Sequence, residues 1–127
     1  MKRFLLMVTA LALLCACATP YKKASSIKGK GYFTTKLQDK VYDITFNGND
    51  ETNLKNAKDY TLLRAAEVCL ENEYQTFQII DKEDNTITIG HDSEPQISMM
   101  ILCSPQDDLF FKAKDVRDSL RTKYRIK

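Results

Sequence analysis

The chain has 127 residues, with 19 lysines and arginines against 17 aspartates and glutamates, four cysteines and a single histidine. This length suits one domain with a modest hydrophobic core. The near balance of charge gives no support to nucleic-acid binding, which needs a basic surface.

The first sixteen residues have the layout of an export signal. Lys2 and Arg3 precede the apolar run FLLMVTALALL at residues 4–14. This run is shorter than the ~20 apolar residues that span a membrane, and it fits a secretory signal peptide. Without the segment 1–16, 111 residues remain, with 17 basic and 17 acidic side chains.

The sequence LCAC at residues 14–17 resembles a bacterial lipobox, in which an apolar residue and two smaller ones precede a lipidated cysteine. Cys17 is the better acceptor, because Cys15 would follow the bulky Leu14 directly. The resemblance implies a diacylglycerol on Cys17, and two or more acyl chains anchor a protein stably. Ala18 in the next position favours export to the outer membrane. We therefore expect a periplasm-facing domain on that membrane, with surface exposure left open.

The exported part is expected to have a short N-terminal tether and a single domain. Residues 17–30 are predicted to be a lipidated flexible tether, because they are small, polar and basic without periodicity. The domain is expected to cover residues 31–127. Its first strands are predicted at residues 32–37 and 40–46, the second from the alternation of apolar and polar residues.

The turn FNGND that follows can be read as an anion site or as a structural joint. Phosphate cradles at helix N-termini use several glycines and a lysine, whereas this turn has Gly48 alone beside acidic Asp50. We therefore predict a joint, in which Gly48 supplies unusual backbone angles. Asn49, Asp50 or Thr52 is expected to cap the helix that begins there.

That helix is predicted over residues 53–72, from its broad apolar side, with Asn72 near its end. Strands are expected at residues 75–81 and 86–90, joined as a hairpin by the turn KEDN. The nearly unbroken apolar run at residues 96–103 predicts a strand covered on both faces, or nearly so.

A second helix is predicted near the C-terminus, capped by Asp107 or Asp108. Its docking face consists of apolar residues at helical spacing: Leu109, Ala113, Val116, Leu120 and Tyr124. The element order is thus (β)β-α-β-β-β-α. It predicts an α+β fold, with a three- to five-stranded antiparallel or mixed sheet and two helices packed on one face.

The segments GYFTTKL, VYDITFNGN and DYTLLRAAE resemble a family of small proteobacterial outer-membrane lipoproteins. Its pattern runs Gly-Tyr, then Tyr-x-Val-x-Phe-x-Gly-Asn, Thr, Tyr-x-Leu-x-Arg-Ala-Ala-Glu and Gly-Tyr-x-x-Phe. Two positions depart from the pattern, with Ile44 in place of Val and Glu73 in place of the Gly before Tyr74. The resemblance implies an anchored α+β domain and brings no reaction, cofactor or ligand. The matching positions are Gly31, Tyr32, Tyr42, Phe46, Gly48, Asn49, Thr52, Tyr60, Leu62, Arg64, Ala65, Ala66, Glu67, Tyr74 and Phe77.

Cys69 and Cys103 are the cysteines of the predicted domain. Disulfides persist in the oxidising compartments where exported proteins reside. A bridge between these two cysteines would close a loop of about 35 residues and stabilise the fold by roughly 3–4 kcal/mol. The alternative is two buried thiols that behave as small apolar residues. Both interpretations stay open.

Four charged residues are candidates for contact with a partner. Arg64 and Glu67 are three positions apart on the predicted helix and can pair. We expect Arg64 to fix this helix to the sheet edge through strand carbonyls, with a partner contact as the alternative. Arg117 and Arg121 lie in a basic C-terminal segment that suits an anionic envelope surface or an acidic protein, although a solvated helix face is commoner.

The sequence offers no catalytic or metal-binding pattern. His91 is expected to be exposed in a loop, and the cysteines have no zinc-site spacing. We therefore predict a non-enzymatic binding or envelope-assembly module without metal or cofactor, held by membrane lipid on Cys17 and open to a periplasmic protein partner. The alternative is an envelope sensor or inhibitor that docks a secreted or periplasmic protein through the basic C-terminal helix.

Overall fold

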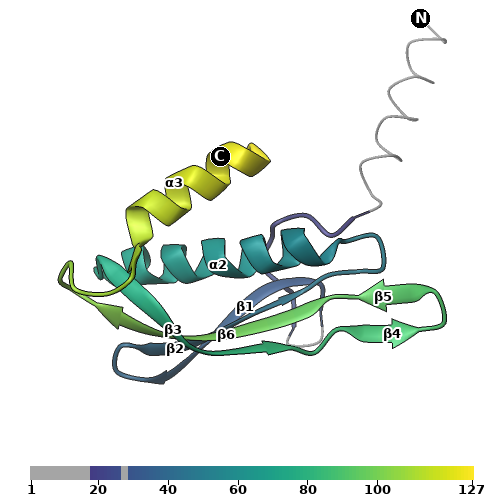
Figure 1. Ribbon diagram of the computed structural model, residues 1–127, viewed down its shortest axis with the longest axis horizontal. Coiled ribbons are helices and arrows are strands. Elements are labelled where there is room, and N and C mark those ends of the chain that lie inside the picture. Colours follow the sequence, from purple (N-terminus) through teal and green to yellow (C-terminus); the bar gives the residue numbers. More distant parts are fainter. Residues whose placement is uncertain (1–17, 27–28) are drawn as a thin grey trace, which may run out of the picture.

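The computed structural model describes residues 18–26 and 29–127, so that the predicted signal peptide and Cys17 lie outside the described residues. Figure 1 shows a sheet, a helix α2 (Leu54–Glu71) along one face of it, and a helix α3 (Ala113–Tyr124) on the far side of α2. Within the described residues, no helix has both the length and the apolarity that a membrane span requires.

The main sheet has five strands in the order β1-β2-β6-β3-β7, and all its pairs are antiparallel. A separate two-stranded sheet joins β4 to β5. The predicted α+β fold, with helices on one face of an antiparallel sheet, is confirmed, and the two-stranded sheet is additional. The strands are β1 (Gly31–Gln38), β2 (Val41–Asn47), β3 (Thr76–Asp84), β4 (Ile87–Ile89), β5 (Asp92–Glu94), β6 (Gln96–Ser104) and β7 (Phe111–Lys112).

The predicted hairpin between residues 75–81 and 86–90 is wrong. Strand β3 continues through the expected turn to Asp84 and pairs with β6, while β4 pairs with β5. The reversal falls at Gly90, whose φ of 63° is the left-handed conformation that tight hairpin turns need. Strands β4 and β5 therefore form the tip of one long β3–β6 hairpin (Figure 1). We call residues 87–94 the arm.

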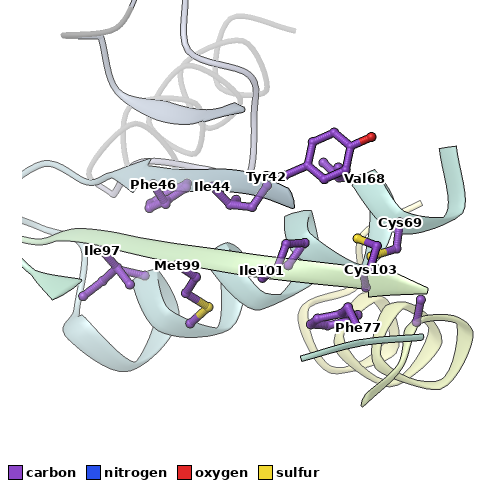
Figure 2. Packing of buried hydrophobic residues seen from close by; sticks show 14 residues of the cluster. Tyr42, Ile44, Phe46, Val68, Cys69, Phe77, Ile97, Met99, Ile101 and Cys103 are labelled. Carbon is purple, nitrogen blue, oxygen red and sulfur yellow. The ribbon is translucent and has the colours of Figure 1, made fainter. Parts of the chain in front are cut away.

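The core lies between the sheet and α2. Alternate residues of β2 and β6 face the helix, among them Ile44, Phe46 and Ile101, which are fully buried (Figure 2). Full burial of such side chains contributes about 1.5–3 kcal/mol each. The residues on the other side of β6 are half-buried and none of them is exposed, so that face of the strand is partly covered. Ala65 and Ala66 are also buried, because small side chains let α2 approach the sheet closely.

Helix α3 begins later than predicted. Residues 111–112 first join the sheet as β7, where the Phe111 ring stacks on Phe77 with ring centres 5.0 Å apart. The N-cap of α3 is Lys112, which has no side-chain capping bond, so the predicted caps at residues 107 and 108 are wrong. Tyr124 packs against Tyr60, and α3 thereby covers the side of α2 that faces away from the sheet.

Both ends of α2 also differ in detail from the prediction. The N-cap is Asn53, whose side chain accepts a 2.8 Å hydrogen bond from the Asn56 N–H, and not one of the residues proposed in the preceding turn. The helix ends in a Schellman motif, in which the Tyr74 N–H donates to the Cys69 carbonyl at 2.8 Å. The left-handed residue there is Glu73, with φ 65°, and not Asn72.

Replacing Glu73 by glycine is expected to stabilise the protein by about 1 kcal/mol, because a residue with a Cβ is strained in the left-handed conformation. Urea denaturation followed by circular dichroism measures the change. Asn72→Gly is the matched control, since φ at that position is −103° and glycine relieves no strain there. A loss of stability in Glu73→Gly would contradict the observed helix end.

Candidate functional site

Residues 18–26, which we call the docked segment, lie against the domain. The Thr19 N–H donates to the Thr52 hydroxyl at 3.0 Å, and the Asn49 N–H donates to the Thr19 hydroxyl at 2.8 Å. Thr19 is buried, with 4% of its surface exposed. The prediction of a flexible tether is therefore wrong for this part of residues 17–30.

Farther along, the docked segment forms a short parallel bridge with the start of β1. The Tyr32 N–H donates to the Lys22 carbonyl at 2.8 Å, and the Ala24 N–H donates to the Tyr32 carbonyl at 2.7 Å. Gly31 makes this approach feasible, because its φ is 116° and a Cβ there would lie 2.4 Å from the Lys22 carbonyl oxygen. Only glycine satisfies both conditions.

Gly48, in the predicted joint, is needed for a different reason. Its φ is not positive, so the prediction of unusual backbone angles is wrong. A Cβ at this position would lie 2.8 Å from Thr52 Cβ and 2.9 Å from Pro95 Cγ. Gly48 thus lets the helix-start loop pack against the base of the arm.

Glu67 joins the docked segment to both helices. Its side chain is 9% exposed and accepts hydrogen bonds from the Tyr21 hydroxyl and from Arg121, whose Nη2 is 2.7 Å from Oε2. Nη1 of Arg64 lies 3.6 Å from Oε1. Burial, and then the hydrogen bond to Glu67, raise the pKa of Tyr21 above its usual range, so the phenol stays protonated and donates.

Arg64 connects α2 to the edge strand β1. Its guanidinium lies 4.6 Å from the centre of the Tyr32 ring, and Nε is 3.4 Å from the Thr34 hydroxyl. Two further hydrogen bonds, of 2.9 and 3.1 Å, go to Glu71. Burial lowers the pKa of Arg64, but the bonds to Glu71 outweigh burial and raise it. Arg64 thus lies on the sheet edge as expected, with a ring and a hydroxyl in place of strand carbonyls.

A row of aromatic rings accompanies these polar contacts. Tyr21 packs between Tyr32 and Tyr60, with ring centres 4.9 and 5.5 Å away. Tyr60 in turn contacts Phe46 in the core at 5.2 Å and Tyr124 on α3 at 4.9 Å. Such pairs contribute about 0.5–1.5 kcal/mol each beyond the area they bury. Tyr60 therefore links the docked segment to the core and to α3.

Several positions of the family resemblance meet at this place. They contact the docked segment directly or bind the residues that do. Sequence reasoning missed Tyr21, whose only signal was an aromatic residue inside an otherwise small and polar stretch. The positions that meet here are Gly31, Tyr32, Asn49, Thr52, Tyr60, Arg64 and Glu67.

The four residues proposed for partner contact have different surroundings. Arg64 and Glu67 are 15% and 9% exposed and pair with each other, and Arg121, which is 37% exposed, pairs with Glu67. Arg117 pairs with its neighbour Asp118 at 2.9 Å and is 29% exposed. All four thus have a charged neighbour within the chain, and a partner contact of any of them stays a prediction.

Cys69 at the end of α2 and Cys103 on β6 are both buried and are free thiols in this structure. Figure 2 shows the two sulfur atoms beside each other. Their mutual hydrogen bond, and then burial, raise the pKa of the Cys69 thiol. The disulfide stays a prediction, which gel mobility under non-reducing conditions with and without thiol blocking decides.

Elsewhere, the described residues contain no group of three or more histidines, cysteines or acids arranged to hold a metal ion. His91 is exposed in the turn of the arm, as predicted. On the sheet face opposite α2, Asp43 shares a shallow hollow with Asp81 and Glu83. Partial burial, and then repulsion from Glu83 and Asp81, raise the pKa of Asp43.

Replacing Asp43 by asparagine is therefore expected to stabilise the protein at pH 7 by a fraction of a kcal/mol, since solvent screens the repulsion. Folding raises the pKa of the Asp43 carboxyl above the value of 3.8 that it has in the unfolded chain. Its contribution to the free energy of unfolding is therefore complete below pH 3.8 and is lost as the pH rises through the folded pKa. The stability gained by the Asp43→Asn change should consequently vanish near pH 3. Melting temperatures at the two pH values measure it, and an equal gain at both would contradict the electrostatic cause.

Comparison of the chain with protein families, with curated proteins and with solved structures finds no match. The family resemblance thus depends on the residues quoted for it. What the site does chemically follows from its contacts: both carboxylate oxygens of Glu67 have donors within the chain. The arrangement holds the docked segment, α2 and α3 together.

Proposed function

We propose that this protein is a lipid-anchored module of the outer membrane, attached through acylated Cys17 and facing the periplasm. It acts in binding or envelope assembly and catalyses no reaction. The supporting observation is the docked segment, because only Ala18 separates Cys17 from the buried Thr19. Two residues span at most ~7 Å. The domain is therefore fixed directly at its anchor.

The residues of the family-like pattern support a binding role over a catalytic one. Their side chains hold the docked segment, and the acid and bases of the cluster neutralise one another. An enzyme needs such groups directed at a substrate. We infer that the pattern serves to orient the domain at the membrane, where other faces meet a partner.

A sensor or inhibitor that docks another protein through α3 is the second candidate. Exposed cations at both ends of this helix favour it, at Lys114, Arg125 and Lys127. Arg121 is 37% exposed on the same helix, but its charge is paired with Glu67. Crosslinking in the envelope followed by pull-down separates the two candidates, and loss of the partner on charge reversal at Lys114 and Arg125 would support docking through α3.

Metabolic labelling with palmitate tests the anchor. The wild-type chain is expected to incorporate label and to float with membranes, whereas Cys17→Ser should do neither. Cys15→Ser is the matched control, because the neighbouring cysteine is not the expected acceptor. Equal labelling of wild type and Cys17→Ser would remove the basis of the proposal.

A further inference from the structure

The docked segment enters the fold at the end of the molecule where the arm projects (Figure 1). Its first buried residue, Thr19, is bonded to the loop between β2 and α2. This loop in turn contacts the base of the arm, where the Gly48 N–H donates to the Pro95 carbonyl at 2.8 Å. Lys30 also bonds the loop to the arm, because its Nζ lies 3.2 Å from both the Gly48 carbonyl and Glu94. The exit of the chain and the arm are thus fixed relative to each other.

This end of the domain exposes large apolar side chains. Ile87 and Ile89 are 52% and 75% exposed and, two residues apart on one strand, point to the same side. Together with Asp50 of the adjacent loop they line a shallow groove. Leu54, at the start of α2, is 39% exposed. Exposed apolar side chains gathered at one end of a domain mark a surface that contacts something less polar than water.

The chain outside the described residues limits what that surface can meet. If Cys17 holds the acyl chains, its backbone lies at the bilayer interface. Only ~7 Å of chain then separates it from Thr19, and the headgroup region itself is about 5–8 Å deep. The end that carries Thr19 and the arm consequently lies at the headgroups, with little freedom to turn away.

We propose that Ile87 and Ile89 rest on the phospholipid surface that carries the protein's own anchor, so that anchor and arm together fix the orientation of the domain. The inference depends on the lipid anchor proposed above. The groove also contains Asp50, Asp92 and Glu94. These acids favour a zwitterionic surface over an anionic one. Strand β6 then leads away from the membrane, and the loop after it faces the periplasm.

Tryptophan fluorescence tests this orientation, because the chain contains no tryptophan of its own. The acylated full chain carrying Ile89→Trp is placed in phosphatidylcholine vesicles that contain a lipid with a nitroxide near the headgroup. Phe110→Trp is the matched control, since Phe110 is 82% exposed and follows the far end of β6. Nine residues of strand separate the two ends by ~27 Å.

We expect the nitroxide to quench the fluorescence of the Ile89→Trp chain roughly twofold or more, and to leave that of the Phe110→Trp chain unchanged, because shallow quenchers act only near the interface. Quenching of the Ile89→Trp chain that is no stronger than that of the control chain would overturn the proposed orientation. Flotation of the same vesicles separates this result from failure of the anchor. A chain that floats without quenching refutes the seating of the arm alone, and a chain that does not float refutes the anchor and the seating together.

Discussion

Replacing Glu67 by leucine is expected to lower the free energy of unfolding by about 3 kcal/mol or more. The change removes the acceptor shared by Tyr21 and Arg121, so a half-buried hydroxyl and a partly buried guanidinium lose their partner together. The docked segment, α2 and α3 lose their common contact at the same time. Urea denaturation followed by far-ultraviolet circular dichroism measures the loss.

Glu71→Leu is the matched control on the same helix. Its side chain is 57% exposed and pairs with Arg64, so we expect a loss below about 1 kcal/mol. The double variant Glu67→Leu with Arg121→Met should cost less than the sum of the single changes, because the second removes the unpaired charge that the first creates. Equal losses in Glu67→Leu and Glu71→Leu would show that the cluster does not hold the segments together.

Much of the sheet could be predicted, since its strands have one face against α2. The alternation in β2 and the apolar run of β6 correspond to strands next to each other in the centre of the sheet. The end of β3 could not be predicted from the same rule. Beyond Phe77 this strand has no neighbour on its β7 side, and charged residues are tolerated on such an edge. A charged strand end therefore looked like a turn.

The site was harder to predict because its contacts are distant in sequence. The bond from Thr19 to Thr52 spans 33 positions, that from Tyr21 to Glu67 spans 46, and that from Arg121 to Glu67 spans 54. A single parallel bridge leaves no periodicity in the sequence. Composition alone therefore made the docked segment look like a linker, and only the structure explains why the resemblance extends over a strand, a turn and a helix.

Gly31 and Gly48, two positions quoted for the resemblance, each have a physical role in the structure. Both stand where another part of the chain comes too close for a Cβ, at Gly31 from the docked segment and at Gly48 from Thr52 and Pro95. At Gly31 the positive φ and the lack of space both exclude a side chain, whereas at Gly48 only the lack of space does. The FNGND turn, which the sequence predicts to be a joint and not an anion site, is therefore a packing joint between the docked segment and the arm.

Replacing Gly31 by alanine is expected to release the docked segment and to lower the free energy of unfolding by about 3 kcal/mol. The new Cβ would lie 2.4 Å from the Lys22 carbonyl oxygen, and φ at this position is 116°, where residues with a side chain are strained. The exposed Lys22 and Lys23 make the release measurable, because trypsin cleaves there once the segment leaves β1. We expect cleavage to become at least tenfold faster, which corresponds to about 1.4 kcal/mol of local opening.

Gly90→Ala separates the two causes of that loss. Gly90 also has a positive φ, of 63°, but no atom lies within 4 Å of the added Cβ. Its replacement should cost only the conformational strain, about 1 kcal/mol, and should leave cleavage at Lys22 and Lys23 unchanged. Should Gly31→Ala behave in the same way as Gly90→Ala in both measurements, the docked segment would not be held against β1, and the short connection that we propose between a lipidated Cys17 and the domain would lose its support.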